Sequence, residues 1–412
     1  MSTTRPPISE KALLILLATV QFAHIMDFMV MMPLGPQLMR ELDIGPERFS
    51  GMVAAYTFAA GLVGLLAAPF MDRFDRRKLL LFCFAGFILG TLACGLAHTA
   101  DALTQARIVC GAFGGVSGAL IMAIVSDVVP PVRRAAGMGI IMTAFSAAAA
   151  LGVPLGLYLA QRFTWETPFF VIVGIGVVTW IALWYYLPPV RDHLNTSAAL
   201  RGEAFWALLR NANAGWALLF MFMLVMGHMI MIPLLSPYLV HNLGLPEESL
   251  SFVYLIGGVL TIFTSPWVGR LADRLGRIQV LGIMIIVAAA VVLTITNAPR
   301  LPIAAILTLS GLFFIFASGR FVPAQAIGSL AVPPSQRGAF MSLNSCVRDL
   351  GAGVAASLAG YIVTTGPSGE MVNFHHIGYL AVGASALSYL IGTRVRTQDI
   401  TPPVAVPLAS NP

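Results

Sequence analysis

Twelve apolar runs, each separated from the next by a short polar or Pro/Gly-rich segment, dominate the pattern of this chain. About 20 predominantly apolar residues are enough for one helix to cross the hydrocarbon core of a bilayer. None of the runs shows the alternation of a barrel strand, so we predict transmembrane α-helices, whose backbone groups bond within the segment. The predicted helices are 12–38, 48–70, 78–98, 102–125, 135–160, 167–187, 214–240, 250–269, 278–297, 301–325, 338–363 and 374–392.

The composition of the chain is that of a polytopic membrane protein. Of the 412 residues, 58% are hydrophobic and only 10% are charged, and the mean hydropathy is +0.85. A soluble domain typically has about 25% charged residues, and this chain has too few to cover so much apolar surface in water. The composition therefore excludes a soluble enzyme, a nucleic-acid-binding module and a disordered protein, and it predicts an all-α membrane protein.

The basic residues predict the orientation of these helices. With the N-terminus in the cytoplasm, 18 of the 24 Lys and Arg residues fall on cytoplasmic segments, Arg320 among them, and 4 fall on the opposite side. The other two, Arg107 and Arg348, lie within predicted helices. Because cytoplasmic loops carry the excess of basic residues, we expect both termini in the cytoplasm. This bias also accounts for the net charge of +6 without a nucleic-acid partner.

One long polar segment divides the chain between the sixth and seventh predicted helices. Within it, 198–210 contains Phe205 and Trp206 and predicts a short helix on the membrane surface. We therefore expect an N-terminal six-helix bundle at 1–187, a cytoplasmic linker at 188–213, a C-terminal six-helix bundle at 214–396 and a disordered cytoplasmic tail at 397–412.

The second half of the chain repeats the first at an offset of about 200 residues. Met29 and Pro33 align with Met229 and Pro233, and each pair falls at the same point of the corresponding predicted helix. Two halves in the same orientation form a parallel repeat, which is found in transporters whose halves rock about a central site. The sequence thus predicts twelve transmembrane helices in two pseudo-symmetric six-helix bundles.

Two loops at equivalent positions carry a specific pattern of glycine, acid and base. GRLADRLGR spans Gly269 to Arg277, and its first-half copy, APFMDRFDRR, has Ala68 and Asp75 at the two glycine positions. In these loops and in its repeat, the sequence resembles the major facilitator superfamily over essentially its full length. The resemblance implies that the loops close the cytoplasmic side through charge contacts with neighbouring helix ends, the alternative being positive-inside anchoring alone. The residues concerned are Asp72, Arg73, Arg76 and Arg77 in the first half and Gly269, Asp273, Arg274, Gly276 and Arg277 in the second.

Motifs in two predicted helices indicate which members of the superfamily the chain resembles. ARIVCGAFGG places Arg107 and Gly111 as in the intramembrane arginine motif of proton-coupled members. ALGVPLG resembles the helix-bending motif of antiporters, with Leu157 where a further glycine is usual. The chain is similar overall to bacterial twelve-span drug/proton antiporters and to the arabinose-efflux-permease-like group. The residues of the bending motif are Gly152, Pro154 and Gly156.

Asp27, near the middle of the first predicted helix, is the main candidate for proton coupling. An ionisable group at the bilayer centre costs about 2.5–3.5 kcal/mol on insertion scales, so a functional role is its default interpretation. His24 and Met31 share its helical face, and the family resemblance places an acid ahead of a proline here in antiporters. We expect Arg107 to tune the charge state of Asp27 or to bind an anionic group. The alternatives are a buried structural ion pair and, for Arg107, a hydrogen bond between packed helices.

The second half contributes further candidates for proton coupling and for the substrate cavity. Arg348 and Asp349 lie near mid-membrane, but neighbouring positions point about 100° apart on a helix. They serve either coupling or a structural salt-bridge network. His228, at the part of 214–240 that corresponds to Asp27, can titrate near neutral pH or can pack as a hydrogen-bonded residue. The candidates for the substrate cavity are Met31, His228, Met231 and Asn344.

Methionine is abundant in the first and seventh predicted helices. This pattern suits a flexible apolar wall or, because thioethers bind Cu(I), a copper path. The Met and His positions follow no ligand spacing, so we expect no metal site and no cofactor. The chain also lacks HExxH, GxSxG and P-loop motifs, which argues against an enzyme and against a transporter that hydrolyses ATP.

Together these features predict a proton-coupled efflux antiporter of the bacterial inner membrane. We expect a monomer whose partners are protons, the lipid bilayer and a small drug-like or sugar-like substrate. A single acid in an apolar cavity favours lipophilic cations or neutral amphiphiles as substrates. The alternative is a proton-coupled importer of a small solute or of Cu(I).

Overall fold

We describe the protein from a computed structural model, which describes residues 9–71, 73–130, 133–191, 208, 210–333 and 336–397. The predicted surface helix at 198–210 and the predicted tail at 397–412 lie almost entirely outside these residues. The first half contains α1 (Glu10–Val30), α2 (Gly35–Glu41), α3 (Pro46–Met71), α4 (Arg76–Gly95), α5 (Ala100–Val128), α6 (Arg134–Ala147), the π-helix η2 (Ala148–Gly152), α7 (Val153–Arg162) and α8 (Thr167–Tyr186).

The second half begins with α10 (Ala212–Met229), α11 (Ile232–His241), the 3₁₀-helix η4 (Glu247–Ser249), α12 (Leu250–Leu275) and α13 (Arg277–Asn297). It continues with α14 (Ile303–Phe313), the π-helix η5 (Phe314–Ser318), α15 (Phe321–Leu330) and α16 (Arg337–Ile362). The antiparallel hairpin of β1 (Thr364–Thr365) and β2 (Met371–Val372) then leads into α17 (Phe374–Gly392). Each predicted helix corresponds to one of these helices or to a consecutive pair, with ends that differ by a few residues.

Ten helical segments of the described chain are long and apolar enough to cross a membrane. Of the twelve predicted crossings, those at α16 and α17 are not among the ten. For α16 the reason is its polar residues, which include Asn344, Arg348 and Asp349. The fold is therefore all-helical and membrane-spanning, and the count of twelve is not reached by this criterion.

Two pairs of consecutive helices are interrupted at equivalent points. A short turn at 31–34, which contains Pro33, separates α1 from α2, and α10 gives way to α11 just before Pro233. Proline lacks the N–H that would continue the helical hydrogen-bond ladder and fits the first turn of a new helix. The repeated Met-x-x-x-Pro pattern of the sequence therefore corresponds to a repeated break in the backbone.

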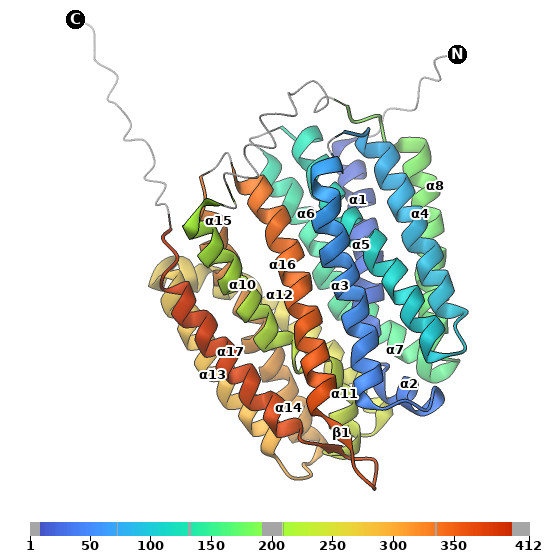
Figure 1. Cartoon of the computed structure of the whole chain (residues 1–412), viewed down its shortest axis with the longest axis vertical. Helices are drawn as coiled ribbons and strands as arrows, with labels where there is room; N and C mark the ends of the chain where they lie inside the picture. Colours follow the sequence, from blue (N-terminus) through green and yellow to red (C-terminus); the bar gives the residue numbers. More distant parts are fainter. Residues whose placement is uncertain are drawn as a thin grey trace, which may run out of the picture.

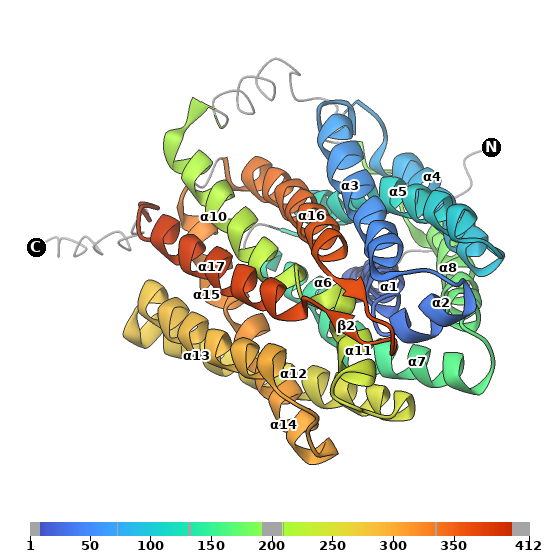
Figure 2. The ribbon, with the colours of Figure 1, turned by 60° about the horizontal axis from the view of Figure 1, so that its bottom comes forward.

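The helices pack as two groups, α1–α8 and α10–α17 (Figures 1 and 2). In the first group α5 packs on α3 and α4, and α4 on α8; in the second α17 packs on α10 and α13. The groups meet along α3 and α16, which lie side by side in both views, and where α12 contacts η2 and α7. The helices therefore surround a central axis between the two groups.

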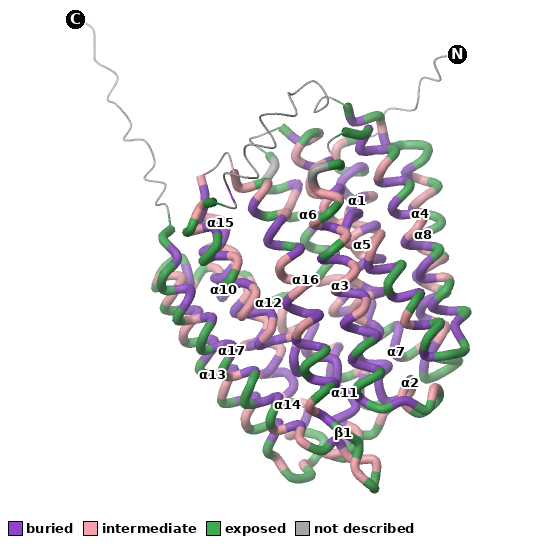
Figure 3. Tube along the Cα trace, viewed as in Figure 1, coloured by how far each residue is buried: buried purple, intermediate pink, exposed green. Residues whose placement is uncertain are grey.

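Burial differs sharply between the inner and outer faces of the helices. Buried residues follow the contacts between helices, and exposed residues lie along the outer surface (Figure 3). The exposed residues include large apolar side chains such as Leu66, Phe263 and Ile286. An exposed apolar surface on this scale needs a non-aqueous surrounding, which is what a bilayer supplies.

The two faces of the molecule across the membrane are distinct. We call the face at which α1 begins and α17 ends the terminal face, and the opposite one, which carries the β1–β2 hairpin, the hairpin face (Figure 1). At the hairpin face the two helix groups are joined by the ion pair of Arg40 with Glu247 and by a hydrogen bond from Gln161 Nε2 to the Glu247 carbonyl, at 2.7 Å. The described contacts therefore join the two helix groups at the hairpin face.

Candidate functional site

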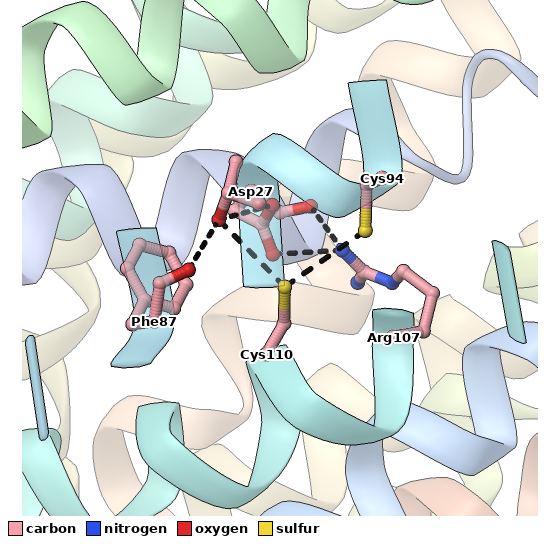
Figure 4. Close-up of polar contacts among 6 residues, drawn as sticks. Asp27, Phe87, Cys94, Arg107 and Cys110 are labelled. Carbon is pink, nitrogen blue, oxygen red and sulfur yellow. Dashed lines mark hydrogen bonds and ion pairs between the residues drawn. The ribbon is translucent and has the colours of Figure 1, made fainter. Parts of the chain in front are cut away.

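The central polar contact of the first helix group joins Asp27 on α1 to Arg107 on α5 (Figure 4). Arg107 Nη1 lies 2.7 Å from Asp27 Oδ2 and 3.3 Å from the Asp27 carbonyl oxygen. Both side chains are 0% exposed. Removing one partner of such a pair typically costs about 3–5 kcal/mol, because the other charge stays buried.

Two further helices complete the surroundings of this ion pair. From α4, the hydroxyl of Thr91 lies 3.3 Å from Asp27 Oδ1 and 3.0 Å from the Phe87 carbonyl oxygen. From α3, the ring of Tyr56 lies under the Arg107 guanidinium, 4.3 Å from its Cζ. Nε and Nη2 of Arg107 are buried without a hydrogen-bond partner among the described residues. The carboxylate is thus better satisfied than the guanidinium.

His24 shares a helix face with Asp27 but makes no hydrogen bond to it in the described structure. Its ring packs edge-on against Phe87, at 4.3 Å between centroids. Its Nε2 and the Tyr56 hydroxyl both lie 3.1 Å from the point where a Cβ on Gly114 would stand. His24 is therefore placed next to the ion pair by Gly114, without being part of it.

The bending motif lies where the two helix groups meet. The π-helix η2 ends at Gly152, and α7 follows with Pro154 in its first turn. A Cβ on Gly156 would stand 2.7 Å from Val30 of α1. A Cβ on Gly258 of α12 would stand 2.6 Å from the Cα of Ala150. The widened turn thus lets this helix pack backbone-to-backbone on the other group.

In the second group the structure corrects the placement of Arg320. The count of basic residues assigns it to the cytoplasmic loops. In the structure it lies between η5 and α15, inside one membrane-spanning segment, and is 3% exposed. Its Nη1 donates to Ser385 Oγ at 2.6 Å and its Nε to the Ala317 carbonyl at 3.0 Å. The count of basic residues misplaces it, because Arg320 lies inside the predicted helix 301–325 and the observed helix continues past it to Leu330.

The other second-group candidates gather near Phe321. The His228 ring lies 5.3 Å from the Phe321 ring, and Arg348 Cζ lies 5.9 Å from the same centroid. Within the described residues, Asp349 forms no ion pair with Arg348 at 4.0 Å or less. Met31 and Met231 are fully buried in helix packing, and Asn344, 2% exposed, contacts Gln325.

The first-half loop binds its own helix group together. Asp75 caps α4, accepting a hydrogen bond from the N–H of Arg77 at 3.0 Å, and pairs with Arg191 at 2.8 Å. Arg76 pairs with Asp127 at the end of α5, and Arg77 donates to the Trp184 carbonyl on α8. Arg73 lies over the Phe70 ring, and Asp72 lies outside the described residues.

The electrostatics of Asp75 follow from these contacts. Partial burial alone raises the pKa of a carboxyl group. For Asp75 this is outweighed by hydrogen bonds from Arg191 and from the backbone N–H groups of Val190 and Arg77, so its pKa lies below the usual value. The carboxylate is therefore held in its charged form.

The second-half loop is more open. Asp273 is 74% exposed and pairs with Arg277 at 3.9 Å on the same loop, and Arg274 is exposed. Gly276 has φ +96°, which L side chains rarely adopt, whereas Asp75 at the corresponding place has φ −58°. Gly269 has only ordinary contacts. The first-half copy therefore does not need the glycine that it lacks.

Three residues of the site were missed from the sequence: Tyr56, Thr91 and the deep position of Arg320. Thr91 and Tyr56 are uncharged polar residues in long apolar runs, a signal that is present but common. Their partners come from other helices, and only the packing identifies them.

Comparison with known proteins agrees with this architecture. The family model described as Major Facilitator Superfamily matches residues 17–356 and also 217–409. An uncharacterized MFS-type transporter of Bacillus subtilis, YceJ, is 26% identical and covers 84% of this chain and 87% of its own length. The putative transporter AraJ of Escherichia coli is 24% identical, covering 90% of this chain and 93% of its own.

A solved structure shares the fold at much lower identity. It is a bacterial homologue of the human lysosomal transporter Spinster, in an inward-facing and unoccupied conformation. The TM-score is 0.77 at 14% identity, with 95% of this chain and 100% of that chain covered. At this identity the likeness establishes the fold alone.

Proposed function

We propose that this chain, which belongs to the major facilitator superfamily, is a proton-coupled secondary transporter that exports a small organic molecule by alternating access. In this proposal α16 and α17 complete twelve crossings of the bacterial inner membrane, and the protein works as a monomer. The terminal face is cytoplasmic, as the excess of basic residues there indicates. We take the hairpin face, where these contacts join the two helix groups, as the closed side, so that in this proposal the described conformation is the inward-facing one.

The observation that carries the proposal is the buried pair of Asp27 and Arg107. Protonating Asp27 removes one charge of the pair and leaves the guanidinium without its counter-ion. An uncompensated buried charge costs about 3–5 kcal/mol. Moving a two-state equilibrium from 1:99 to 99:1 takes about 5.5 kcal/mol. The free energy released or spent when one proton binds at Asp27 is therefore large enough to drive most of a change between the inward-facing and outward-facing states.

The location of the pair supports coupling to motion. It joins α1 to α5, and α1 also packs on η2 and α7, which contact α12 of the other helix group. A change in the contact of α1 with α5 is therefore passed to a junction between the groups. In this scheme Arg107 tunes Asp27, and His24 shapes its surroundings.

The bending motif favours export by exchange. An antiporter must not let protons pass without substrate, so the two groups must seal against each other. Gly152, Pro154 and Gly156 give a bent helix whose backbone at Ala149 and Ala150 packs on Gly258. This close backbone contact supports a seal between the two helix groups.

The loop residues fit a gate on the cytoplasmic side. In the first half, Asp75, Arg76 and Arg77 clamp α4, α5, α8 and the start of the linker into one unit. In the second, Asp273 remains exposed. We propose that this exposed loop forms contacts with the other helix group when the cytoplasmic side closes.

The proposal is tested with the variant Asp27→Asn. Growth inhibition of an efflux-deficient bacterium, with lipophilic cations, organic anions, neutral antibiotics, sugars and copper, first identifies a substrate. Transport of that substrate into proteoliposomes is then driven by an imposed pH gradient. We expect Asp27→Asn to abolish gradient-driven transport while keeping exchange of labelled for unlabelled substrate.

Asp101→Asn is the matched control, because this carboxylate is 77% exposed and pairs with Arg48 at the surface. It should transport as the wild type does. Gradient-driven transport by Asp27→Asn at the wild-type rate would overturn the proposal. Greater sensitivity of wild-type cells, to copper above all, would favour an importer instead.

A further inference from the structure

We propose that the second helix group holds a binding site for an organic anion with an aromatic body, formed by His228, Arg320, Phe321 and Arg348. The inference rests on the proposed function, since it names the substrate class of the transporter. Three helical segments supply the site: His228 lies near the end of α10, Arg320 and Phe321 lie at the start of α15, and Arg348 lies on α16.

Arg320 is a buried cation without an anion. Its two described hydrogen bonds go to neutral acceptors, Ser385 Oγ and the Ala317 carbonyl oxygen. Within the described chain it forms no ion pair. Burial of an ion carries a penalty that only a close counter-charge repays. A purely structural role would leave that penalty uncompensated, whereas an anionic ligand would offset it.

The backbone is arranged so that Arg320 can take this position. Ser385 Oγ, which accepts the hydrogen bond from Arg320, would stand 2.7 Å from a Cβ on Gly227. Only a glycine at this point of α10 lets α17 approach closely enough. His228 follows Gly227 on α10, and its ring packs against Phe313 and Phe321.

Two more polar groups near Phe321 lack partners. Nδ1 of His228 is buried without a hydrogen bond among the described residues, and the side chain is 7% exposed. Nε of Arg348 is also buried without a hydrogen-bond partner among the described residues. Buried polar nitrogens are normally hydrogen-bonded. Two such nitrogens beside one phenyl ring would both find a partner in the acceptor group of a bound ligand.

The chemistry of these groups selects the ligand. Guanidinium groups bind carboxylate, sulfonate or phosphate oxygens through charge-assisted hydrogen bonds. The ring of Phe321, which is only partly buried, lies beside both His228 and Arg348 and offers an apolar surface for an aromatic body.

The charge balance of the membrane-embedded residues points the same way. Asp27 is taken up by Arg107. Arg320 and Arg348 against Asp349 leave one positive charge in the second group. The sequence alone favours lipophilic cations or neutral amphiphiles, because Asp27 is the one acid assigned to an apolar cavity. The ion pair with Arg107 removes that reason, and the remaining positive charge repels a cation.

The test uses ligands that differ only in charge. Purified full-length protein in neutral detergent is titrated with 2-naphthoate, naphthalene-2-sulfonate, the neutral 2-naphthamide and the cationic 2-naphthylmethylammonium, and binding is measured by microscale thermophoresis. We expect the two anions to bind at least about 10-fold more tightly than the amide or the cation, the usual size of a charge-assisted contact.

Variants locate the site. Arg320→Gln and Arg348→Gln should each weaken binding of 2-naphthoate by about 10-fold or more, and Arg320→Lys should retain part of it. Arg162→Gln, at an exposed position at the end of α7, should bind as the wild type does. Size-exclusion chromatography identifies any variant that is misfolded, and Arg348, which is only half buried, is the arginine more tolerant of substitution.

The outcomes separate this inference from the proposed function. Anion binding that is lost in Arg320→Gln or Arg348→Gln and kept in Asp27→Asn supports the site, whether or not a pH gradient drives transport. Preference for the cation or the amide overturns it. So does the absence of anion binding in the wild type, or anion binding that neither arginine variant weakens.

Discussion

Asp75 Oδ2 lies 2.8 Å from Arg191 Nε, and this contact ties the loop between α3 and α4 to the first residues after α8. The same carboxylate caps α4. Asp75 stands where the family resemblance of the sequence places a glycine, yet it holds the terminal-face end of the first helix group together. The first-half loop therefore has, in place of a glycine, a carboxylate that caps α4 and pairs with Arg191.

Two substitutions of Asp75 separate its two roles. Asp75→Asn keeps a capping oxygen and loses the charge, so it should cost at most about 1 kcal/mol, since Arg191 is largely exposed. Asp75→Ala loses the cap as well and should cost about 1 kcal/mol more. Thermal unfolding in detergent at neutral pH measures both. Equal stability of the two variants would contradict the capping role.

The charge of Asp75 also predicts a pH dependence. Its pKa is lowered in the folded protein, so its stabilisation is present above the unfolded pKa of about 3.9 and is lost as pH falls through the folded value. The difference in stability between wild type and Asp75→Asn should therefore be constant near neutral pH and disappear below about pH 4. A difference that persists in acid would show that the charge is not its source.

The glycines of the second-half loop should respond differently to alanine. Gly276→Ala forces a side chain to φ +96° and should destabilise the protein by about 1–3 kcal/mol. Gly269→Ala meets only Val322 at 3.6 Å and, being helical, should be neutral or slightly stabilising. Thermal unfolding of the pair measures this. Similar losses in both variants would contradict the description of the loop.

Gly111 should be required for the support of Arg107. A Cβ there would collide with the backbone of Tyr56, whose ring lies under the guanidinium. Gly111→Ala should cost about 1–3 kcal/mol and reduce gradient-driven transport. Gly174→Ala on α8, where a Cβ has nothing within 4 Å, is the control and should lose neither stability nor transport. Wild-type behaviour of both variants would contradict the tight packing of α3 on α5.

Gly258 should be required for the seal between the helix groups. A Cβ there would stand 2.7 Å from the Ala149 carbonyl oxygen and would push α12 away from η2. We expect Gly258→Ala to increase proton leak through proteoliposomes several-fold in the absence of substrate, as followed with a trapped pH-sensitive dye. Gly139→Ala on α6 has open space and should not leak. Proteoliposomes containing Gly258→Ala that leak protons no faster than those with the wild type would contradict the seal.

The sequence predicted the helices well because their signal is local. Long apolar runs ended by charges mark where a chain can enter and leave a bilayer, and the observed helices end within a few residues of these points. Arg320 is the exception: the count of basic residues places it with the cytoplasmic loops although the predicted helix 301–325 contains it, and the structure buries it with acceptors on its own segment and on α17.

The site was only partly predictable. Asp27 and Arg107 stand out in sequence as charges within apolar runs, but their contact depends on how α1 and α5 are rotated and aligned in depth. Thr91 and Tyr56 join them from α4 and α3 for the same reason. An apolar run leaves rotation and depth free, since lipid accepts any face of it.

The sequence by itself thus determined ten of the predicted membrane-spanning helices and the family, because apolar runs and loop motifs are local patterns in the chain. Only the tertiary structure decided which charges are paired. It joins Asp27 to Arg107 and leaves Arg320 without a carboxylate among the described residues, which is the basis for proposing an anionic substrate. In a medium of low dielectric, the interaction of a charge with its nearest partner dominates its electrostatic energy. Only the packing of the helices determines which partner that is.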